Sequence, residues 1–447
     1  MKRTDVLVVG GSAAGIVAAI TAKSNYPEKT VLVIRQESQV LVPCGIPYIF
    51  GSLDSIEKNV IPDAVLSKAG VDLIVGQAIE INQKEKTCLL KDSTTITFEK
   101  MVLATGSSPV VPKWLKGADL ENVFVIPKNK EYISKVLDKT DNCKKIVTIG
   151  AGFIGVEVSD ELNKRGKDVT LVEILPNILG LAFDKEFAVI AEGLLKQRGV
   201  HLKTGSGVKE IIGNNKLTGA LLNNSETIEA DAVILTMGYT PNVALAKKSG
   251  LNITDKGFIA VDEYMRTENS DIFAVGDCAE KRDFITRKHS GVMLASTACA
   301  EARVAGMNLY KLSTLKTLSG TIAIFSTAIG NIGFGAAGLT EDVAQKEGFD
   351  VITGSFEGVD RHPVTLPDTH KQYIKLIVAK ESGVVLGGEV AGGLSVGELT
   401  NLIGLVIQNR MSINSILTAQ IGTHPLLTGP PTAYPLIKAA EVVAKNL

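Results

Sequence analysis

The sequence predicts an α/β protein of two or three domains, on three observations. The chain has 447 residues, which is more than one hydrophobic core usually serves. A unit made of an apolar strand, a glycine-rich turn, a helix and a second strand occurs twice, beginning near residues 6 and 146. The last part of the chain mixes strands and helices without this repeat, which predicts a separate α+β domain.

The first unit begins with the strand 6–9 and turns at Gly10-Gly-Ser-Ala-Ala-Gly15 before an alanine-rich helix and the strand 31–34. Glycines allow a tight turn and a close approach of the backbone to a pyrophosphate, and the helix N-terminus offers free N–H groups to phosphates. Ser12 replaces the middle glycine, which a small residue can do. The residues expected to bind this first dinucleotide are Gly10, Ser12, Ala13, Ala14 and Gly15.

The ribose contact of the first unit stays open. Arg35 stands where an acidic residue is expected at the end of the second strand, and Glu37 follows two residues later. Either Glu37 or the backbone bonds the ribose hydroxyls. We keep both Arg35 and Glu37 as candidates for cofactor binding.

The second unit has the strand 146–149, the turn Gly150-Ala-Gly-Phe-Ile-Gly155, a helix to Arg165 and the strand 168–172. Glu173 follows this strand at the usual spacing for a carboxylate that holds an adenosine ribose. Such a carboxylate repels a 2′-phosphate, so we expect NADH to be preferred, with NADPH kept as the alternative because Arg165 and Lys167 are near. The expected contacts are Gly150, Gly152, Phe153, Ile154, Gly155 and Glu173. Two such units predict two dinucleotides, FAD and NAD(P).

The C-terminal part is expected to contain strands at 373–378 and 383–390, a helix at 399–408 and a proline-punctuated loop at 425–435. The formal net charge is −1, so no basic excess points to nucleic acid or to an anionic membrane. Five scattered cysteines without a CxxC pair argue against a disulfide framework or a zinc site. The two apolar stretches, near the N-terminus and at 317–340, contain Asp5 and several glycines, so we expect no membrane segment and a cytoplasmic protein.

Four further motifs carry a family resemblance: Pro43-Cys-Gly-Ile-Pro-Tyr48, Ala104-Thr-Gly-Ser-Ser-Pro109, Gly238-Tyr-Thr-Pro-Asn242 and Asp271-Ile-Phe-Ala-Val-Gly-Asp277. Together with the two glycine turns, and over nearly the whole chain, they resemble the FAD-dependent pyridine nucleotide–disulfide oxidoreductases. The first motif resembles the single-cysteine branch, which contains coenzyme A–disulfide reductases, persulfide and polysulfide reductases, and NADH oxidases or peroxidases.

The resemblance implies an architecture. An FAD domain is split between residues 1–112 and 245–320, an NAD(P) domain occupies 113–244, and residues 321–447 form the dimerisation domain of a homodimer. It also implies that Asp277 bonds the FAD ribityl chain. The remaining FAD contacts that it implies are Pro43, Ala104, Thr105, Gly106, Gly238 and Gly276.

Cys44 is the expected redox residue. Pro43, Gly45 and Pro47 suggest a turn into the start of a helix, where a thiol has a lowered pKa and is available as thiolate. By resemblance, this sulfur lies beside the flavin and cycles between thiolate and a mixed disulfide, persulfide or sulfenic acid. Ile49 stands where two-cysteine relatives have their second cysteine, so an internal redox disulfide is excluded at this motif. A structural role is expected for Cys88, Cys143, Cys278 and Cys299.

Departures from relatives narrow the electron acceptor. The first glycine turn lacks the His of NADH peroxidases and water-forming oxidases, and the following helix keeps only Lys23 of the basic residues that hold coenzyme A phosphates. The pair His424-Pro425 resembles the catalytic His-Pro of glutathione reductase, and His424 is a candidate acid–base residue. We therefore predict an NADH-dependent reductase of a disulfide, persulfide or polysulfide. The alternatives are an NADH oxidase that reduces O₂ and an electron-transfer subunit for a partner redox protein.

Overall fold

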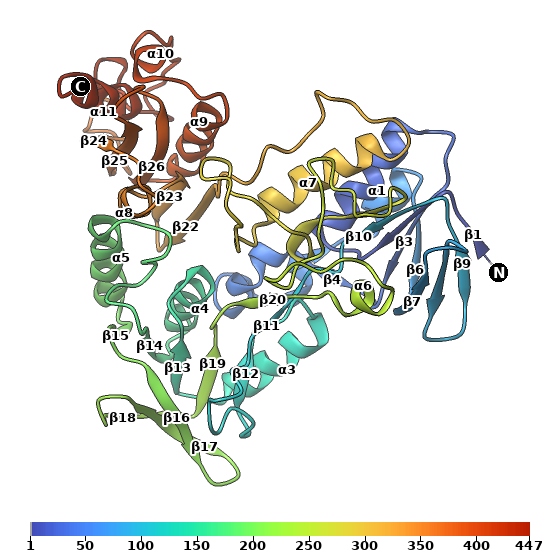
Figure 1. Cartoon of the computed structure of the whole chain (residues 1–447). Helices are drawn as coiled ribbons and strands as arrows, with labels where there is room; N and C mark the ends of the chain where they lie inside the picture. Colours follow the sequence, from blue (N-terminus) through green and yellow to red (C-terminus); the bar gives the residue numbers. More distant parts are fainter. Residues whose placement is uncertain (1) are drawn as a thin grey trace.

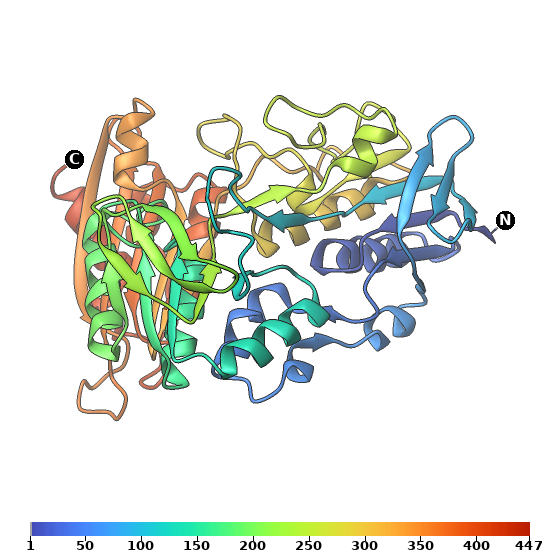
Figure 2. The ribbon, with the colours of Figure 1, turned by 90° about the horizontal axis from the view of Figure 1, so that it is seen from below.

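The computed structural model describes residues 2–447, and sheets organise each part of the chain (Figure 1). In both views the N-terminal sheets, coloured blue, and the C-terminal sheet, coloured red, lie at opposite ends of the molecule (Figure 2). No helix among residues 2–447 is long and apolar enough to cross a membrane.

The first glycine unit belongs to a five-stranded parallel sheet. Its order is β21 (Ile272–Ala274), β10 (Lys100–Leu103), β2 (Val6–Val9), β3 (Val31–Arg35) and β6 (Asp72–Val75). The strand β21 thus returns to this sheet after the whole second unit has been built. Helices α1 (Ala13–Asn25) and α7 (Ala295–Asn308) pack together on one face of the sheet. A small sheet covers the other face, with strands β1 (Lys2–Arg3), β7 (Ala78–Asn82), β8 (Thr87–Leu90) and β9 (Thr95–Thr97).

The second glycine unit forms its own five-stranded parallel sheet. The order is β12 (Val123–Val125), β19 (Ala232–Leu235), β13 (Lys145–Ile149), β14 (Asp168–Val172) and β15 (His201–Lys203). The helices of this part are α3 (Lys130–Asp141), α4 (Phe153–Lys164) and α5 (Lys185–Arg198). An antiparallel excursion contains β16 (Val208–Gly213), β17 (Leu217–Leu222) and β18 (Thr227–Glu229). The expected strand 168–172 is present with the predicted bounds.

The C-terminal sheet is antiparallel throughout. Its order is β22 (Phe325–Ile329), β23 (Ile332–Gly338), β26 (Val385–Gly392), β25 (Lys371–Ala379) and β24 (Val351–Val359). Its helices are α8 (Glu341–Lys346), α9 (Val396–Gln408), α10 (Ile413–Leu417) and α11 (Pro435–Ala444). The strands and the helix expected here are present with bounds shifted or extended by a few residues, and the region around 425–434 is a loop that contains the short turn η5 (Pro431–Ala433).

Short elements connect these sheets and surround the site. Strands β11 (Ser107–Pro109) and β20 (Tyr239–Pro241) pair antiparallel. The segment that leads into the second unit therefore lies beside the segment that leads out of it. The other short elements are β4 (Val40–Leu41), η1 (Pro43–Gly45), η2 (Pro47–Phe50), η3 (Ile56–Asn59), β5 (Val60–Ile61), α2 (Ala64–Lys68), α6 (Ala244–Lys248) and η4 (Gly276–Cys278).

Candidate active site

One cavity of about 1300 Å³ opens at the carboxyl ends of the strands of the first sheet. This exceeds the usual range of roughly 300–1,000 Å³ for a small-molecule site, so it has room for more than one ligand group. Ligands of parallel α/β sheets bind at this edge. The wall brings together most of the first glycine turn, Cys44 and Asp277, and it includes Phe153 and Ile154 from the second unit.

The first glycine turn is closed by backbone packing. Gly10 has φ +118°, and a Cβ there would lie 2.1 Å from the carbonyl oxygen of Ala104. A Cβ on Gly15 would lie 1.8 Å from the oxygen of Gly10. Helix α1 begins directly after Ser12, with no side chain capping its N-terminus. Its first N–H groups are therefore available to an anion, and the turn fits a pyrophosphate.

Arg35 turns inward at the end of β3. Its guanidinium donates to both oxygens of Asp63, at 2.7 and 2.9 Å, and to the backbone oxygens of Glu37 and Ser38. Only 3% of Arg35 is exposed. Its charge is used to shape the loop after β3, and both Arg35 and the half-buried Glu37 line the cavity.

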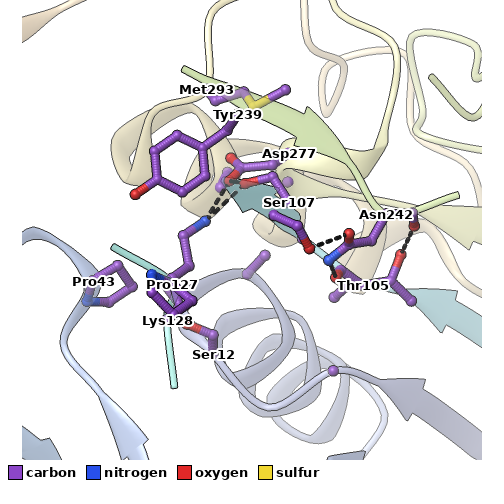
Figure 3. Close-up of a pocket in the computed structure, with 18 of the residues that line it drawn as sticks. Ser12, Pro43, Thr105, Ser107, Pro127, Lys128, Tyr239, Asn242, Asp277 and Met293 are labelled. Carbon is purple, nitrogen blue, oxygen red and sulfur yellow. Dashed lines mark hydrogen bonds and ion pairs between the residues drawn. The ribbon is translucent and has the colours of Figure 1, made fainter. Parts of the chain in front are cut away.

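Asp277 projects into the cavity from η4. Its Oδ2 accepts hydrogen bonds from Lys128 Nζ at 2.6 Å and from Ser107 Oγ at 2.7 Å (Figure 3). Burial pushes the pKa of Asp277 upwards, but the Lys128 ammonium and the Ser107 hydroxyl outweigh it and hold that pKa below its ordinary value. Asp277 is therefore a carboxylate, and its Oδ1 has no partner among residues 2–447, which fits an acceptor for a sugar hydroxyl.

Two of the remaining motifs meet beside Asp277. Thr105 Oγ1 donates to the backbone oxygen of Asn242 at 2.6 Å, and Asn242 Nδ2 donates to the Thr105 oxygen at 3.0 Å (Figure 3). The Asn242 N–H also donates to Gly106. The expected residues Ala104, Thr105, Gly106 and Gly238 all line the cavity, and the bonds to Asn242 join Thr105 and Gly106 within its wall.

Cys44 is a free thiol that is exposed to the cavity. The expectation that the pKa of the Cys44 thiol is lowered is wrong, because the groups of this chain raise it. Burial raises the pKa of the Cys44 thiol, the Glu157 carboxylate raises it further, and Lys128 lowers it by less. The expected lowering by a helix N-terminus is missing because η1 spans only Pro43–Gly45, so few aligned peptide dipoles act on the sulfur.

Helix α4 fixes the Cys44 segment. The Ser52 N–H and hydroxyl both donate to the Glu161 carboxylate, the hydroxyl at 2.9 Å. Arg165 donates to the backbone oxygens of Ile49 and Leu53 at 3.3 and 3.1 Å. Because α4 belongs to the second unit, the position of the sulfur depends on how the two units pack.

The second glycine turn touches the cavity only at its end. Gly150 has φ +101°, and α4 begins after Gly152 without a side-chain cap. Gly152, Phe153 and Ile154 line the cavity, whereas Gly150, Gly155 and Glu173 do not. The Glu173 carboxylate is buried and accepts from the N–H groups of Ala151 at 2.6 Å and of Leu175 at 2.9 Å, so it braces the turn.

Glu157 is a wall residue that the sequence analysis did not identify. It lies one helical turn after Phe153, and Thr327 of β22 donates to its Oε1 at 2.7 Å. Burial raises the pKa of Glu157 to about 7, against the hydrogen bond from Thr327, which lowers it. Its position on the same helix face as Phe153 was a usable signal, whereas nothing in the sequence near Thr327 or Lys128 indicated that either joins the site.

The matches to family models agree with this geometry. A model described as pyridine nucleotide-disulphide oxidoreductase matches residues 4–302, and the model of its dimerisation domain matches residues 324–433. The chain belongs to this family. This pyridine nucleotide-disulphide oxidoreductase is a flavin-dependent NAD(P)H oxidoreductase that uses FAD, with a C-terminal dimerisation domain, as the motifs predicted.

Its relatives differ in their electron acceptors. This oxidoreductase is 30% identical over 439 residues to a protein named NADH oxidase from Enterococcus faecalis, across 95% of this chain and 96% of that protein. It is 32% identical over 407 residues to one named NAD(P)H coenzyme A polysulfide/persulfide reductase from Pyrococcus horikoshii, across 88% of each. A solved NAD-dependent persulfide reductase from A. fulgidus matches with a TM-score of 0.91 and 29% identity, over 99% of this chain and 83% of that one.

The oxidoreductase does not bring His424 to the sulfur of its own chain. His424 is exposed on the loop before η5, and its Nδ1 accepts from the Leu426 N–H at 3.3 Å. The C-terminal domain contributes only Phe325 and Ser326 to the cavity wall. Any role of His424 at a Cys44 therefore requires a second subunit.

Proposed function

We propose that this oxidoreductase passes electrons from NADH through FAD to Cys44 and on to a disulfide, persulfide or polysulfide. The observation that carries the proposal is the Cys44 thiol, which opens into the same cavity as the first glycine turn and Asp277. Within this proposal, residues 1–112 and 245–320 hold FAD, residues 113–244 hold the nicotinamide nucleotide, and residues 321–447 form the dimer contact.

Sequence identity does not distinguish the electron acceptors, because it is 30% to an NADH oxidase and 32% to a polysulfide/persulfide reductase. The residues of the cavity do distinguish them. Small or apolar residues line the cavity where the first turn and α7 face it, among them Ala13, Met293 and Ala298. No His, Lys or Arg of the first turn is present there to protonate a peroxide. Lys23 Nζ donates to the oxygens of Pro27 and Lys29, both at 2.8 Å, so it closes the turn after α1 instead of facing the cavity. These features favour a small sulfur substrate over coenzyme A derivatives.

The chemistry assigned to Cys44 is nucleophilic. Its thiolate attacks one sulfur of the substrate, a Cys44–sulfur bond forms as the substrate S–S bond breaks, and the other half leaves as a thiolate or hydrosulfide. FAD, when bound, would supply the pair of electrons that NADH delivers. That pair would break the bond between Cys44 and the retained sulfur, so that this half leaves as a second thiolate or hydrosulfide and Cys44 returns to its thiolate. Phosphates of FAD fit the N-terminus of α1, and the ribityl hydroxyls fit Asp277.

Glu173 supports NADH as the preferred nucleotide. Its carboxylate ends β14 and is already held by the Ala151 and Leu175 N–H groups, so its charge is fixed where a 2′-phosphate would lie. Moving that phosphate next to a buried carboxylate is unfavourable, and NADPH should therefore be the poorer donor.

We further propose that the enzyme is a homodimer in which His424 serves the Cys44 of the partner subunit. The dimerisation-domain match and the exposed imidazole support this. Because Leu426 donates to Nδ1, a neutral ring carries its proton on Nε2, from which it can donate a hydrogen bond to a leaving thiolate. A mixed dimer of Cys44→Ser and His424→Ala chains should regain one working site of the two. It should therefore show about half of the activity of a native dimer. Activity no higher than that of the two parent variants would contradict a shared site.

The experiment for the proposed function is anaerobic NADH turnover with cystine, inorganic polysulfide, coenzyme A disulfide and coenzyme A persulfide. Oxygen consumption is measured alongside under air. The proposal expects polysulfide or a small disulfide to be reduced faster than O₂. Rapid oxygen consumption with no sulfur compound reduced would establish the oxidase alternative instead. The five free cysteines suit the reducing cytoplasm, which we propose as the location.

A further inference from the structure

A buried ion pair lies directly behind the loop that presents Asp277. Lys281 and Glu301 are 1% and 0% exposed at their side chains, and Lys281 Nζ lies 3.6 Å from Glu301 Oε1. Burying two charges costs several kcal/mol, and apolar replacements of such pairs are often neutral or stabilising. The pair is therefore poorly explained by stability alone, and its hydrogen bonds indicate another use.

Both backbone groups of Gly276 are bonded to this pair. The Gly276 N–H donates to Glu301 Oε2 at 2.7 Å, and Lys281 Nζ donates to the Gly276 oxygen at 2.6 Å. Lys281 also donates to the oxygen of Ala279 at 3.0 Å, which closes the turn over η4. The Gly276 N–H is thus held by the Glu301 side chain, and the Gly276 oxygen accepts from Lys281 in addition to the Ala279 N–H at 3.0 Å.

Gly276 has the conformation that needs such support. Its φ is +76°, and a Cβ there would lie 3.0 Å from the Cβ of Ala14 in the first glycine turn. Its buried N–H would cost about 1–3 kcal/mol if the Glu301 carboxylate did not accept from it. The orientation of Asp277, the next residue, follows directly from the peptide that the pair holds.

The pair also joins two parts of the cavity wall. Glu301 lies on α7, whose first residues Ala295 and Ala298 line the cavity, while Lys281 follows η4. A Cβ on Gly276 would lie 3.6 Å from the Cβ of Ala298, in ordinary contact, so η4 packs directly against α7. A change in the pair therefore shifts η4 relative to α7 and moves Asp277 in the cavity.

We propose that Lys281 and Glu301 are positioning residues for FAD, which hold Gly276 so that Asp277 and the N-terminus of α7 meet the cofactor correctly. Neither side chain lines the cavity, so neither touches FAD itself. Burial raises the pKa of Glu301 to about 7, and the Lys281 ammonium and the Gly276 N–H act against that rise. Lys281 thus stabilises the carboxylate that accepts from Gly276.

The test compares purified holoenzymes of Lys281→Met and Glu301→Gln with the unchanged protein. We measure the FAD to protein ratio, the rate of FAD release after dilution from the rise in flavin fluorescence, and the position and fine structure of the 450 nm flavin band. Lys281→Met should release FAD roughly ten times faster or more and lose fine structure. Glu301→Gln, which keeps an oxygen for the Gly276 N–H, should show a smaller change of about threefold.

A matched control separates positioning from general loosening. Lys375 is also a buried lysine, 5% exposed at its side chain, and it pairs with Asp184, Glu186 and Glu341 between the second unit and the C-terminal sheet. Lys375→Met should lower the melting temperature without changing FAD release or the flavin band. Release within twofold of the unchanged protein in both site variants would overturn the proposal, as would equal acceleration in Lys375→Met. If Lys281→Met does not fold, Glu301→Gln carries the same decision.

Discussion

The two strand–turn–helix units share a glycine-rich turn, but the two turns contribute different numbers of residues to the cavity wall. In the first, residues 9–14 line the cavity, and Gly10 lies against the Ala104 backbone. In the second, only residues 152–154 of the turn reach the wall, and Glu173 braces the turn from behind. This difference supports our proposal that the first unit encloses FAD as a resident cofactor and that the second binds the nicotinamide nucleotide, which enters and leaves. It teaches that units with the same glycine pattern can differ in how far the turn enters the cavity and in the residue at the strand end.

The largest effect is expected from substituting the first glycine of each turn, Gly10 in the first unit and Gly150 in the second. Gly10 and Gly150 both have positive φ, and an added Cβ would lie 2.1 Å from the Ala104 oxygen and 2.6 Å from the Thr236 oxygen respectively. Strain of this kind costs about 1–3 kcal/mol or more. Gly10→Ala should yield protein with tenfold or more weakened FAD retention, seen as loss of absorbance at 450 nm.

Gly150→Ala is the counterpart. It should remain yellow and show a raised KM for NADH with FAD content unchanged. Should both variants lose FAD to the same degree, the assignment of one ligand to each unit would be wrong.

A smaller effect is expected on the preference of the second unit for NADH over NADPH, from changes at Glu173. Glu173→Ala should reduce the ratio of NADH to NADPH efficiency by about tenfold, since a hydrogen bond to a charged group contributes about 1.5–3 kcal/mol. Glu173→Gln keeps an acceptor for the Ala151 N–H but removes the charge, so it should tolerate NADPH with a smaller loss toward NADH. Stopped-flow reduction of the flavin by each nucleotide measures both. Equal rates with the two nucleotides in the unchanged enzyme would refute the preference.

The smallest effect concerns the sulfur. Glu157 raises the pKa of Cys44, so Glu157→Gln should lower that pKa and move the pH profile of iodoacetamide alkylation to lower pH. Thr327→Val is the matched control: it removes the hydrogen bond that lowers the pKa of Glu157, but the thiol titrates above pH 9, where Glu157 stays ionised, so the profile should stay close to that of the unchanged enzyme. An unchanged profile in Glu157→Gln would show that Glu157 does not act on the thiol.

The sequence was informative where chemistry is local. Glycine spacing predicted both units, and the motif around Asp277 predicted a cavity carboxylate, because a turn and its helix are specified by neighbouring residues. It failed where distant segments meet. The pKa of Cys44 is raised by burial and then by Glu157, which lies on α4 of the other unit, and the inward turn of Arg35 depends on Asp63. No spacing rule relates such residues, because packing of separate elements brings them together.

The central claim is that Cys44 carries electrons from the flavin to sulfur. The most direct measurement mixes NADH-reduced enzyme with inorganic polysulfide anaerobically and follows the return of flavin absorbance at 450 nm, in the unchanged protein and in Cys44→Ser. Serine keeps the shape of the site, so reduction of the flavin by NADH should be nearly the same in both. Reoxidation by polysulfide should fall at least about a hundredfold in Cys44→Ser, because the covalent route is removed, while reoxidation by O₂ persists. Reoxidation by polysulfide at the unchanged rate in Cys44→Ser would contradict the account.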